Sequence, residues 1–117
     1  MIKKIFILSV LLLAMGCEEK LEYAIEASRT GVALIASEDV AAGIESLTKA
    51  KEAYEEMLTV EPGNALYQNN YGWVLMQLGE YDAAEVQFKK AAEQSDSINH
   101  SSAPRKNLTE LAKLKTQ

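Results

Sequence analysis

The sequence predicts an all-α fold for most of its 117 residues. Beyond Lys20, alanine, glutamate, leucine, lysine and glutamine are frequent and runs of β-branched residues are absent, which favours helices over strands. Both prolines, Pro62 and Pro104, lie outside the segments in which apolar residues recur at helical spacing. An apolar pattern also repeats after 34 residues. We therefore expect about five antiparallel helices and no sheet.

The repeated pattern has several members, each displaced by the same number of positions. The pairs are Leu47 and Tyr81, Ala50 and Ala84, Tyr54 and Phe88, and Met57 and Ala91. Together with Gly72, Leu75 and Gly79, the second copy resembles the tetratricopeptide repeat (TPR), a pair of antiparallel helices with this period. The resemblance implies a short TPR-like helical array over residues 21–117: a divergent helix pair (21–64), a TPR repeat (65–98) and a capping helix (104–115).

Small residues in the second copy have expected packing roles. Gly72 and Ala84 are expected to face each other where the two helices cross, because small side chains allow a close approach. Gly79 is expected to end the first helix in a left-handed C-cap. Tyr81 and Phe88 are then expected to fill the wedge between the helices.

The first helix pair is expected over residues 21–36 and 40–60. Pro62, Gly63 and Asn64 supply a helix breaker and then an N-cap for the next helix. The spacing from Gly31 to Ala50 exceeds that from Gly72 to Ala84 by seven residues. We interpret residues 37–39 as an N-cap and acidic first turn that follow a lengthened connection.

The last helix is expected to begin at Pro104, a residue that suits the first turn of a helix. Residues 99–102 before it, Asn-His-Ser-Ser, read as a connection. Leu108, Leu111 and Ala112 lie on one side of the expected helix. In the resemblance to TPR proteins, such a helix closes the array by covering the apolar edge of the preceding repeat.

The first residues predict an export signal. Lys3 and Lys4 precede an apolar run, residues 5–14, which is too short to span a bilayer comfortably. The run ends in Met-Gly at Cys17, the only cysteine, and this ending resembles the bacterial lipobox. The resemblance implies a signal peptide over residues 1–16, cleavage before Cys17, a diacylglycerol on its thiol and a lipidated tether over residues 17–20. An ordinary cleaved signal with an incidental cysteine and an uncleaved anchor helix are the alternatives.

These features predict a membrane-anchored lipoprotein of the bacterial cell envelope. Glu18, rather than aspartate, follows the cysteine, which favours the periplasmic face of the outer membrane. Removal of residues 1–16 takes away two lysines, so the net charge changes from −5 to −7. A phosphate-binding surface needs clustered lysine and arginine, so we expect no nucleic-acid partner.

The sequence offers no constellation for catalysis. His100 is the sole histidine and lies in a stretch rich in serine and asparagine, and no second cysteine exists to complete a zinc site. Adjacent carboxylates such as Glu55 and Glu56 point about 100 degrees apart on a helix and read as solvated surface. We therefore expect no enzyme, no cofactor and no metal.

Binding is the expected activity. In TPR proteins the first helix of each pair lines a concave surface, and the resemblance places Asn69, Trp73, Met76 and Gln77 on it. Helical spacing also puts these residues on one side of the helix. An aromatic anchor beside amides suits a peptide ligand. The alternative for Trp73 is packing against the preceding helix pair.

Two functions follow from this reading. The first is an adaptor or scaffold that binds a peptide or protein partner in the cell envelope. The second is a structural role, in which the chain forms a homo-oligomer and buries its repeat faces between subunits. The second stays open because isolated repeats cannot bury their faces and about three are usually needed.

Overall fold

The computed structural model describes residues 16–94 and 98–117, most of which are helical. The helices are α2 (Cys17–Ala36), α3 (Val40–Val60), α4 (Ala65–Gln77), α5 (Tyr81–Gln94) and α6 (Ile98–Lys115). No strand occurs among the described residues, so the expected all-α class is confirmed for them. The expected signal peptide, residues 1–16, lies outside the described residues except for Gly16.

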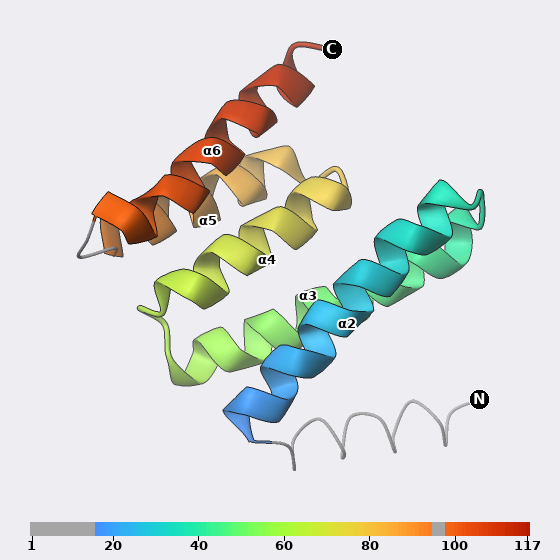
Figure 1. Ribbon diagram of the computed structural model, residues 1–117, viewed down its shortest axis with the longest axis horizontal. Helices are drawn as coiled ribbons and strands as arrows, with labels where there is room; N and C mark the ends of the chain where they lie inside the picture. Colours follow the sequence, from blue (N-terminus) through green and yellow to red (C-terminus); the bar gives the residue numbers. More distant parts are fainter. Residues whose placement is uncertain (1–15, 95–97) are drawn as a thin grey trace.

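The helices form two layers. In Figure 1, α2, α4 and α6 lie at the front, and α3 and α5 lie behind them. The shortest dimension of the molecule is 19 Å, which corresponds to two layers of helices about 10 Å across. α4 packs against α3, α5 and α6, so it is the central element of the array.

The buried side chains form two clusters that meet at α4. The first cluster joins α2, α3 and α4 around Leu47, Tyr54 and Met57. The second joins α4, α5 and α6 around Phe88 and Leu111. Each helix pair therefore relies on the next helix in the chain to cover its apolar side, as in repeat proteins.

Local capping follows the expectations at two places. The side chain of Asn64 accepts a hydrogen bond from the Tyr67 amide at 3.0 Å, which caps α4 as predicted. Gly79 has a φ of 80°, and the amide of Glu80 donates to the Leu75 carbonyl at 2.9 Å. This left-handed ending of α4 is the one expected for Gly79.

The connection between α2 and α3 differs from the expectation. It has three residues, Ser37, Glu38 and Asp39, and so does the connection between α4 and α5. Glu38 adopts a φ of 71° at the position equivalent to Gly79, and Asp39 caps α3, whose first turn holds no acidic residue. The expected lengthened connection and acidic first turn are therefore wrong.

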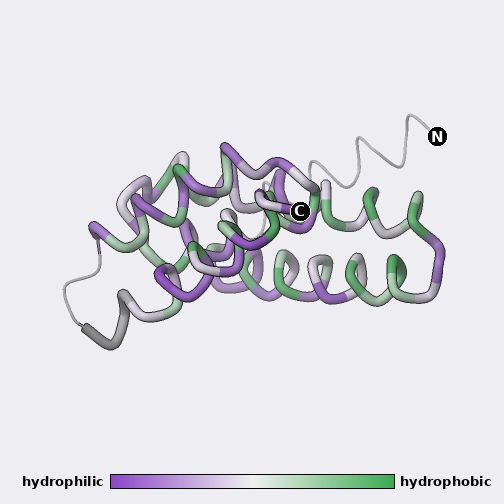
Figure 2. The backbone as a smooth tube through the Cα atoms, turned by 90° about the horizontal axis from the view of Figure 1, so that it is seen from above, coloured by the Kyte–Doolittle hydropathy of each residue, from purple (hydrophilic) through white to green (hydrophobic). Residues whose placement is uncertain are grey.

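The seven additional residues lie in the helices instead. α3 has 21 residues and α5 has 14. Their last residues, Val60 and Gln94, are 34 positions apart, whereas their first residues, Val40 and Tyr81, are 41 positions apart. Seven residues make about two helical turns, so the α2–α3 hairpin extends two turns further at its tip. Figure 2 shows this hairpin projecting beyond the other helices.

The glycines mark the closest contacts between helices. A methyl group on Gly31 would lie 2.7 Å from Leu47 Cγ and 2.9 Å from the Gly43 carbonyl oxygen. Gly31 therefore packs against Gly43 and Leu47 of α3. It does not pack against Ala50 as Gly72 was expected to pack against Ala84 in the second pair. In the second pair, a methyl group on Gly72 would lie 2.7 Å from the ring of Phe88, which is nearer than the expected neighbour, Ala84.

α2 begins at Cys17, four residues earlier than expected, so the segment expected as a tether is helical. Lys20 lies in this first part of α2 and is mostly buried. Its Nζ atom lies 3.0 Å from Glu56 Oε1 on α3. The first turn of α2 is therefore packed against the domain.

α6 also begins earlier than expected, at Ile98, so residues 99–102 are helical and Pro104 lies inside the helix. Proline lacks the amide proton that a helix interior needs, which is why the sequence favoured a start at Pro104. Pro104 and Leu111 are buried, whereas Ala112, which was expected on the side of α6 that covers the preceding helices, is exposed. The covering side of α6 therefore includes Pro104 and excludes Ala112. At the end of α6, Lys115 Nζ pairs with Glu85 on α5 at 2.7 Å.

Candidate binding groove

A cavity of about 330 Å³ opens between α2 and α4, with α3 as its floor. The residues that line it come from all three helices: Ile25, Ser28, Arg29, Tyr54, Asn70 and Trp73. A volume of this size accommodates one or two amino-acid side chains and lies at the lower end of small-ligand sites. Because side chains of three helices converge on it and combine apolar and polar groups, we take this cavity as the candidate binding site.

Hydrogen bonds fix three of the polar side chains that line the cavity. Tyr54 is buried and its hydroxyl is hydrogen-bonded to the Asn70 side chain. Burial raises the pKa of Tyr54, and the hydrogen bond from Asn70 opposes that rise in part. Ser28 Oγ donates to the Ala24 carbonyl at 2.7 Å. These bonds hold the polar side chains in place before any ligand arrives.

The walls of the cavity combine apolar surface with one cation. Trp73 and Ile25 are each partly buried, and Trp73 packs against both apolar clusters. The Arg29 guanidinium lies 3.5 Å from Glu26, and both side chains are about three-quarters exposed. Exposed ion pairs of this kind contribute little, so Arg29 can turn toward a carboxylate in a ligand.

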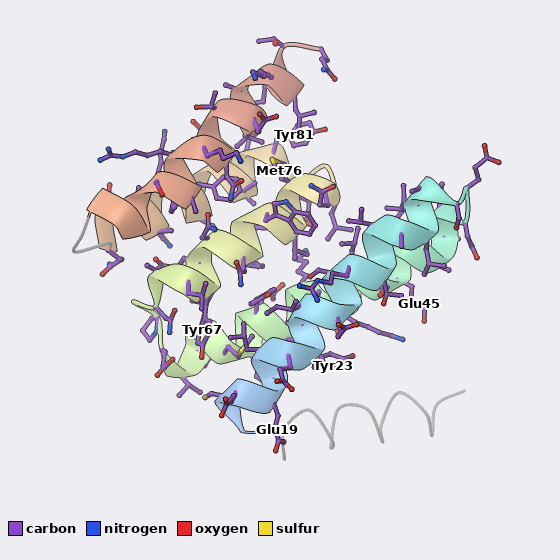
Figure 3. All side chains as sticks on the ribbon, viewed as in Figure 1. Glu19, Tyr23, Glu45, Tyr67, Met76 and Tyr81 are labelled. Atoms are coloured by element: carbon purple, nitrogen blue, oxygen red, sulfur yellow. The ribbon has the colours of Figure 1, made fainter. Side chains whose placement is uncertain are left out.

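Of the four residues expected on the concave surface, only Trp73 lines this cavity. Asn69 Oδ1 accepts a hydrogen bond from Asn107 of α6 at 3.0 Å. Met76 is buried in the second cluster, and Figure 3 shows it on the side of α4 that faces α6. Gln77 is exposed at the end of α4. The structure thus separates Trp73 from the other three, and α6 covers part of their face.

The alternative for Trp73, packing against the preceding helix pair, also describes its position. Its ring contacts the cluster formed by α2, α3 and α4 while its remaining surface lines the cavity.

No family model, curated protein or solved structure matches the chain. The groove must therefore be interpreted from its own side chains.

Sequence reasoning missed the contribution of α2 to the groove. Ile25, Ser28 and Arg29 lie on one face of α2 at spacings of three and four residues, which is the only sequence signal for them. Cys17, the expected lipidation site, is an exposed free thiol at the first residue of α2.

The described residues contain neither a helix suited to span a membrane nor a cluster of side chains suited to hold a metal ion. No described helix combines the length and the apolar character needed to cross a bilayer. No group of three or more histidine, cysteine, aspartate or glutamate side chains in the same ranges could hold a metal ion.

A second hollow lies on the opposite side of α4. It has a volume of about 300 Å³, and its lining includes Glu55, Gln68, Tyr71 and Lys90. Gln68 donates to the Pro62 carbonyl at 2.7 Å, and its Oε1 atom is buried without a hydrogen-bond partner. An unpaired buried acceptor lowers stability by about 1–3 kcal/mol. The hydrogen-bonding groups on this side of α4 are therefore less completely paired than those on the groove side.

Tyr71 provides a testable property of this hollow. Burial, the largest cause, and the nearby Glu55 carboxylate, which is hydrogen-bonded to the hydroxyl, together raise the pKa of Tyr71 to about 12. Because the pKa in the folded state exceeds its ordinary value, the neutral phenol stabilises the fold below pH 10, and this contribution is lost as the pH rises through about 12. Absorbance of tyrosinate should therefore show one tyrosine that ionises near pH 12.

Substitutions assign that ionisation. We expect Tyr71→Phe to remove the step near pH 12, and Glu55→Gln to move it toward the ordinary tyrosine value. A step near pH 12 that persists in Tyr71→Phe would show that another tyrosine is responsible.

Proposed function

We propose that the protein is a membrane-anchored interaction module of the bacterial cell envelope, a TPR-like lipoprotein that binds a peptide or a segment of a protein partner. The ligand occupies the groove between α2 and α4, and no catalysis is involved. The anchor is a diacylglycerol on Cys17, and the outer membrane, on its periplasmic face, is the proposed location.

The observation that carries this proposal is the composition of the cavity. Trp73 and Ile25 offer apolar surface for one side chain of a ligand, and Asn70 offers an amide that can bond a peptide main chain. Arg29 stands at the same cavity and can pair with a carboxylate. A short peptide that combines an aliphatic or aromatic residue with an acidic one matches all three features.

The location rests on the order of residues before the domain. Two lysines, an apolar run and Gly16 precede Cys17, whose thiol is exposed. Mass spectrometry of the mature N-terminus is expected to find diacylglycerol on Cys17. Detection of an intact Met1 would contradict both cleavage and lipidation.

The peptide proposal can be tested with the only tryptophan of the chain as the reporter. We expect a pool of short peptides containing leucine or phenylalanine beside aspartate to shift the emission of Trp73 to shorter wavelength. Arg29→Gln should then weaken binding of a selected peptide at least about tenfold, since a charge-assisted hydrogen bond contributes about 1.5–3 kcal/mol.

The matched control is Arg105→Gln, because Arg105 is the only other arginine and is exposed on α6. This variant should bind the peptide as the unsubstituted protein does. A pool that leaves the emission of Trp73 unchanged, or equal losses in the two arginine variants, would contradict the groove as the binding site.

A homo-oligomeric structural protein is the second candidate, and the tip of the α2–α3 hairpin favours it. Val40 and Ile44 on this projecting hairpin are 50% and 47% exposed, so they could contact another copy. Sedimentation at several concentrations separates the two functions, because a monomer at all concentrations would eliminate this candidate.

A further inference from the structure

The two most exposed large apolar side chains of the described residues lie at the edge of the domain near Cys17. Val60 at the end of α3 is 68% exposed, and Leu66 in the first turn of α4 is 54% exposed. They are two of the five large apolar side chains that stand out as exposed in the described ranges. Figure 1 shows the beginning of α2, the end of α3 and the beginning of α4 at one corner of the molecule.

Side-chain contacts place this corner next to Cys17. Lys20, one turn after Cys17, pairs with Glu56, one turn before Val60, so the antiparallel helices bring Cys17 opposite the end of α3. Tyr67, the neighbour of Leu66, is close enough to Cys17 and Glu61 for both to raise the pKa of its hydroxyl, after burial. We call the surface formed by Cys17, Val60 and Leu66 the anchor edge.

The chain itself indicates what covers the anchor edge. The apolar run of residues 5–14 leads directly to Cys17, and Cys17 is already the first residue of α2. A diacylglycerol on Cys17 would join the domain at the first residue of α2, and residues 5–14 precede Cys17 by only two residues, so either hydrophobic anchor meets the domain at the anchor edge. A bilayer that holds the anchor would therefore be next to Val60 and Leu66.

We propose that the anchor edge rests on the surface of a lipid bilayer with zwitterionic headgroups, with the side chains of Val60 and Leu66 in its interfacial region. This inference rests on the anchoring included in the proposed function. Charge selects the lipid class, because the exposed carboxylates of Glu18, Glu19 and Glu61 lie within a few residues of Cys17 or Val60, and Lys20 is already paired with Glu56. Carboxylates at this edge are repelled by anionic lipids.

The proposed orientation also fixes the distance between the groove and the bilayer surface. Ile25 follows Cys17 by eight residues and Arg29 by twelve, which is about 12 Å and 18 Å along the axis of α2. A ligand in the groove then lies close to the headgroups.

The test uses the full lipid-anchored chain in phosphatidylcholine vesicles whose acyl chains carry bromine, a quencher of tryptophan fluorescence. In a Trp73→Phe background, single tryptophans replace Val60 or Leu66, and Ile44→Trp is the matched control. Ile44 lies on the same helix as Val60, is 47% exposed and is about 24 Å away along the axis. We expect at least about twofold quenching at positions 60 and 66 and none at position 44.

Each other result overturns the proposal. Equal quenching at all three positions means that the domain has no fixed orientation, and no quenching in protein that floats with the vesicles means that the edge stands off the bilayer. Stronger quenching in vesicles with added phosphatidylglycerol excludes the zwitterionic assignment. Protein that does not float with the vesicles removes the anchor as well, while peptide binding monitored by Trp73 remains an independent test of the groove.

A second measurement avoids the substitutions. In the unsubstituted chain, vesicles should slow hydrogen exchange of the amides around the α3–α4 connection and leave the tip of the α2–α3 hairpin unchanged. Slower exchange at the tip would contradict the proposed orientation.

Discussion

Replacement of Phe88 by alanine is expected to lower the free energy of unfolding by about 3–5 kcal/mol. Phe88 is completely buried, lies in the cluster that joins α4, α5 and α6, and touches the helix position kept open by Gly72. Small domains have about 5–15 kcal/mol of stability in total, so this variant should unfold at much lower urea concentration. Urea titration followed by circular dichroism measures the change.

The control for this substitution is Val86→Ala on the same helix. Val86 is 49% exposed, and surface substitutions usually change stability by less than about 0.5 kcal/mol. If the two variants unfolded at the same urea concentration, the second cluster would not be the core of the α4–α5 pair.

A double-mutant cycle tests the contact between Gly72 and Phe88. A methyl group on Gly72 would lie 2.7 Å from the ring, so Gly72→Ala forces the ring to move. Phe88→Leu removes part of that conflict, and we expect the two changes to couple by about 0.5–3 kcal/mol. Simple additivity would mean that the helices adjust elsewhere.

Gly43→Leu is the second substitution with a large expected effect, more than about 3 kcal/mol of lost stability. A methyl group on Gly43 would lie 2.5 Å from Ile35 Cγ1 and 2.7 Å from the carbonyl oxygen of Gly31. Backbone cannot rotate away as a side chain can, so α2 and α3 must separate along the extended part of their hairpin. The better helix propensity of leucine returns only about 1 kcal/mol. Thermal unfolding measures the loss.

Two substitutions check that contact, rather than the loss of glycine, causes the effect. Ala41→Leu adds the same side chain two positions away on the exposed side of α3 and should be nearly neutral. Gly63→Ala meets no atom closer than 3.6 Å and should not destabilise the fold. A Gly43→Leu variant as stable as these two would refute the close crossing of α2 and α3.

Local signals in the sequence were sufficient for much of the fold. The bounds of α3 follow from Asp39, which caps its first turn, and from Pro62, which prevents continuation beyond its end. Asn64 and Gly79 act through one or two neighbouring backbone groups, so the sequence alone identifies them. The predicted start of α6 was wrong because proline usually occupies the first turn of a helix, whereas Pro104 lies inside α6. The burial of Pro104 against the other helices was not visible in the sequence.

The groove required information that helical spacing does not contain. Trp73 was recognised from its place on α4, but its cavity exists because Ile25 and Arg29 on α2 approach it across more than 40 residues of chain. Likewise, Asn69 looked available for binding until α6 placed Asn107 against it. Periodicity identifies which side of a helix is apolar, whereas the identity of the neighbouring helix decides which residues meet.

The two-turn extension of the α2–α3 hairpin shows how one helix pair can become longer without losing its packing against the next helix. Seven residues rotate a helix by about 700 degrees, only about 20 degrees short of two full turns, so the buried face is preserved. Gly43, Ala50 and Met57 accordingly follow one another at intervals of seven on the buried side of α3. An insertion of five residues would instead rotate that face by about 140 degrees relative to the rest of the helix and turn it toward solvent. A step of seven residues, about 10 Å, therefore lengthens the hairpin without changing its buried face when the partner helix lengthens in parallel, and α4 keeps the same packing surface.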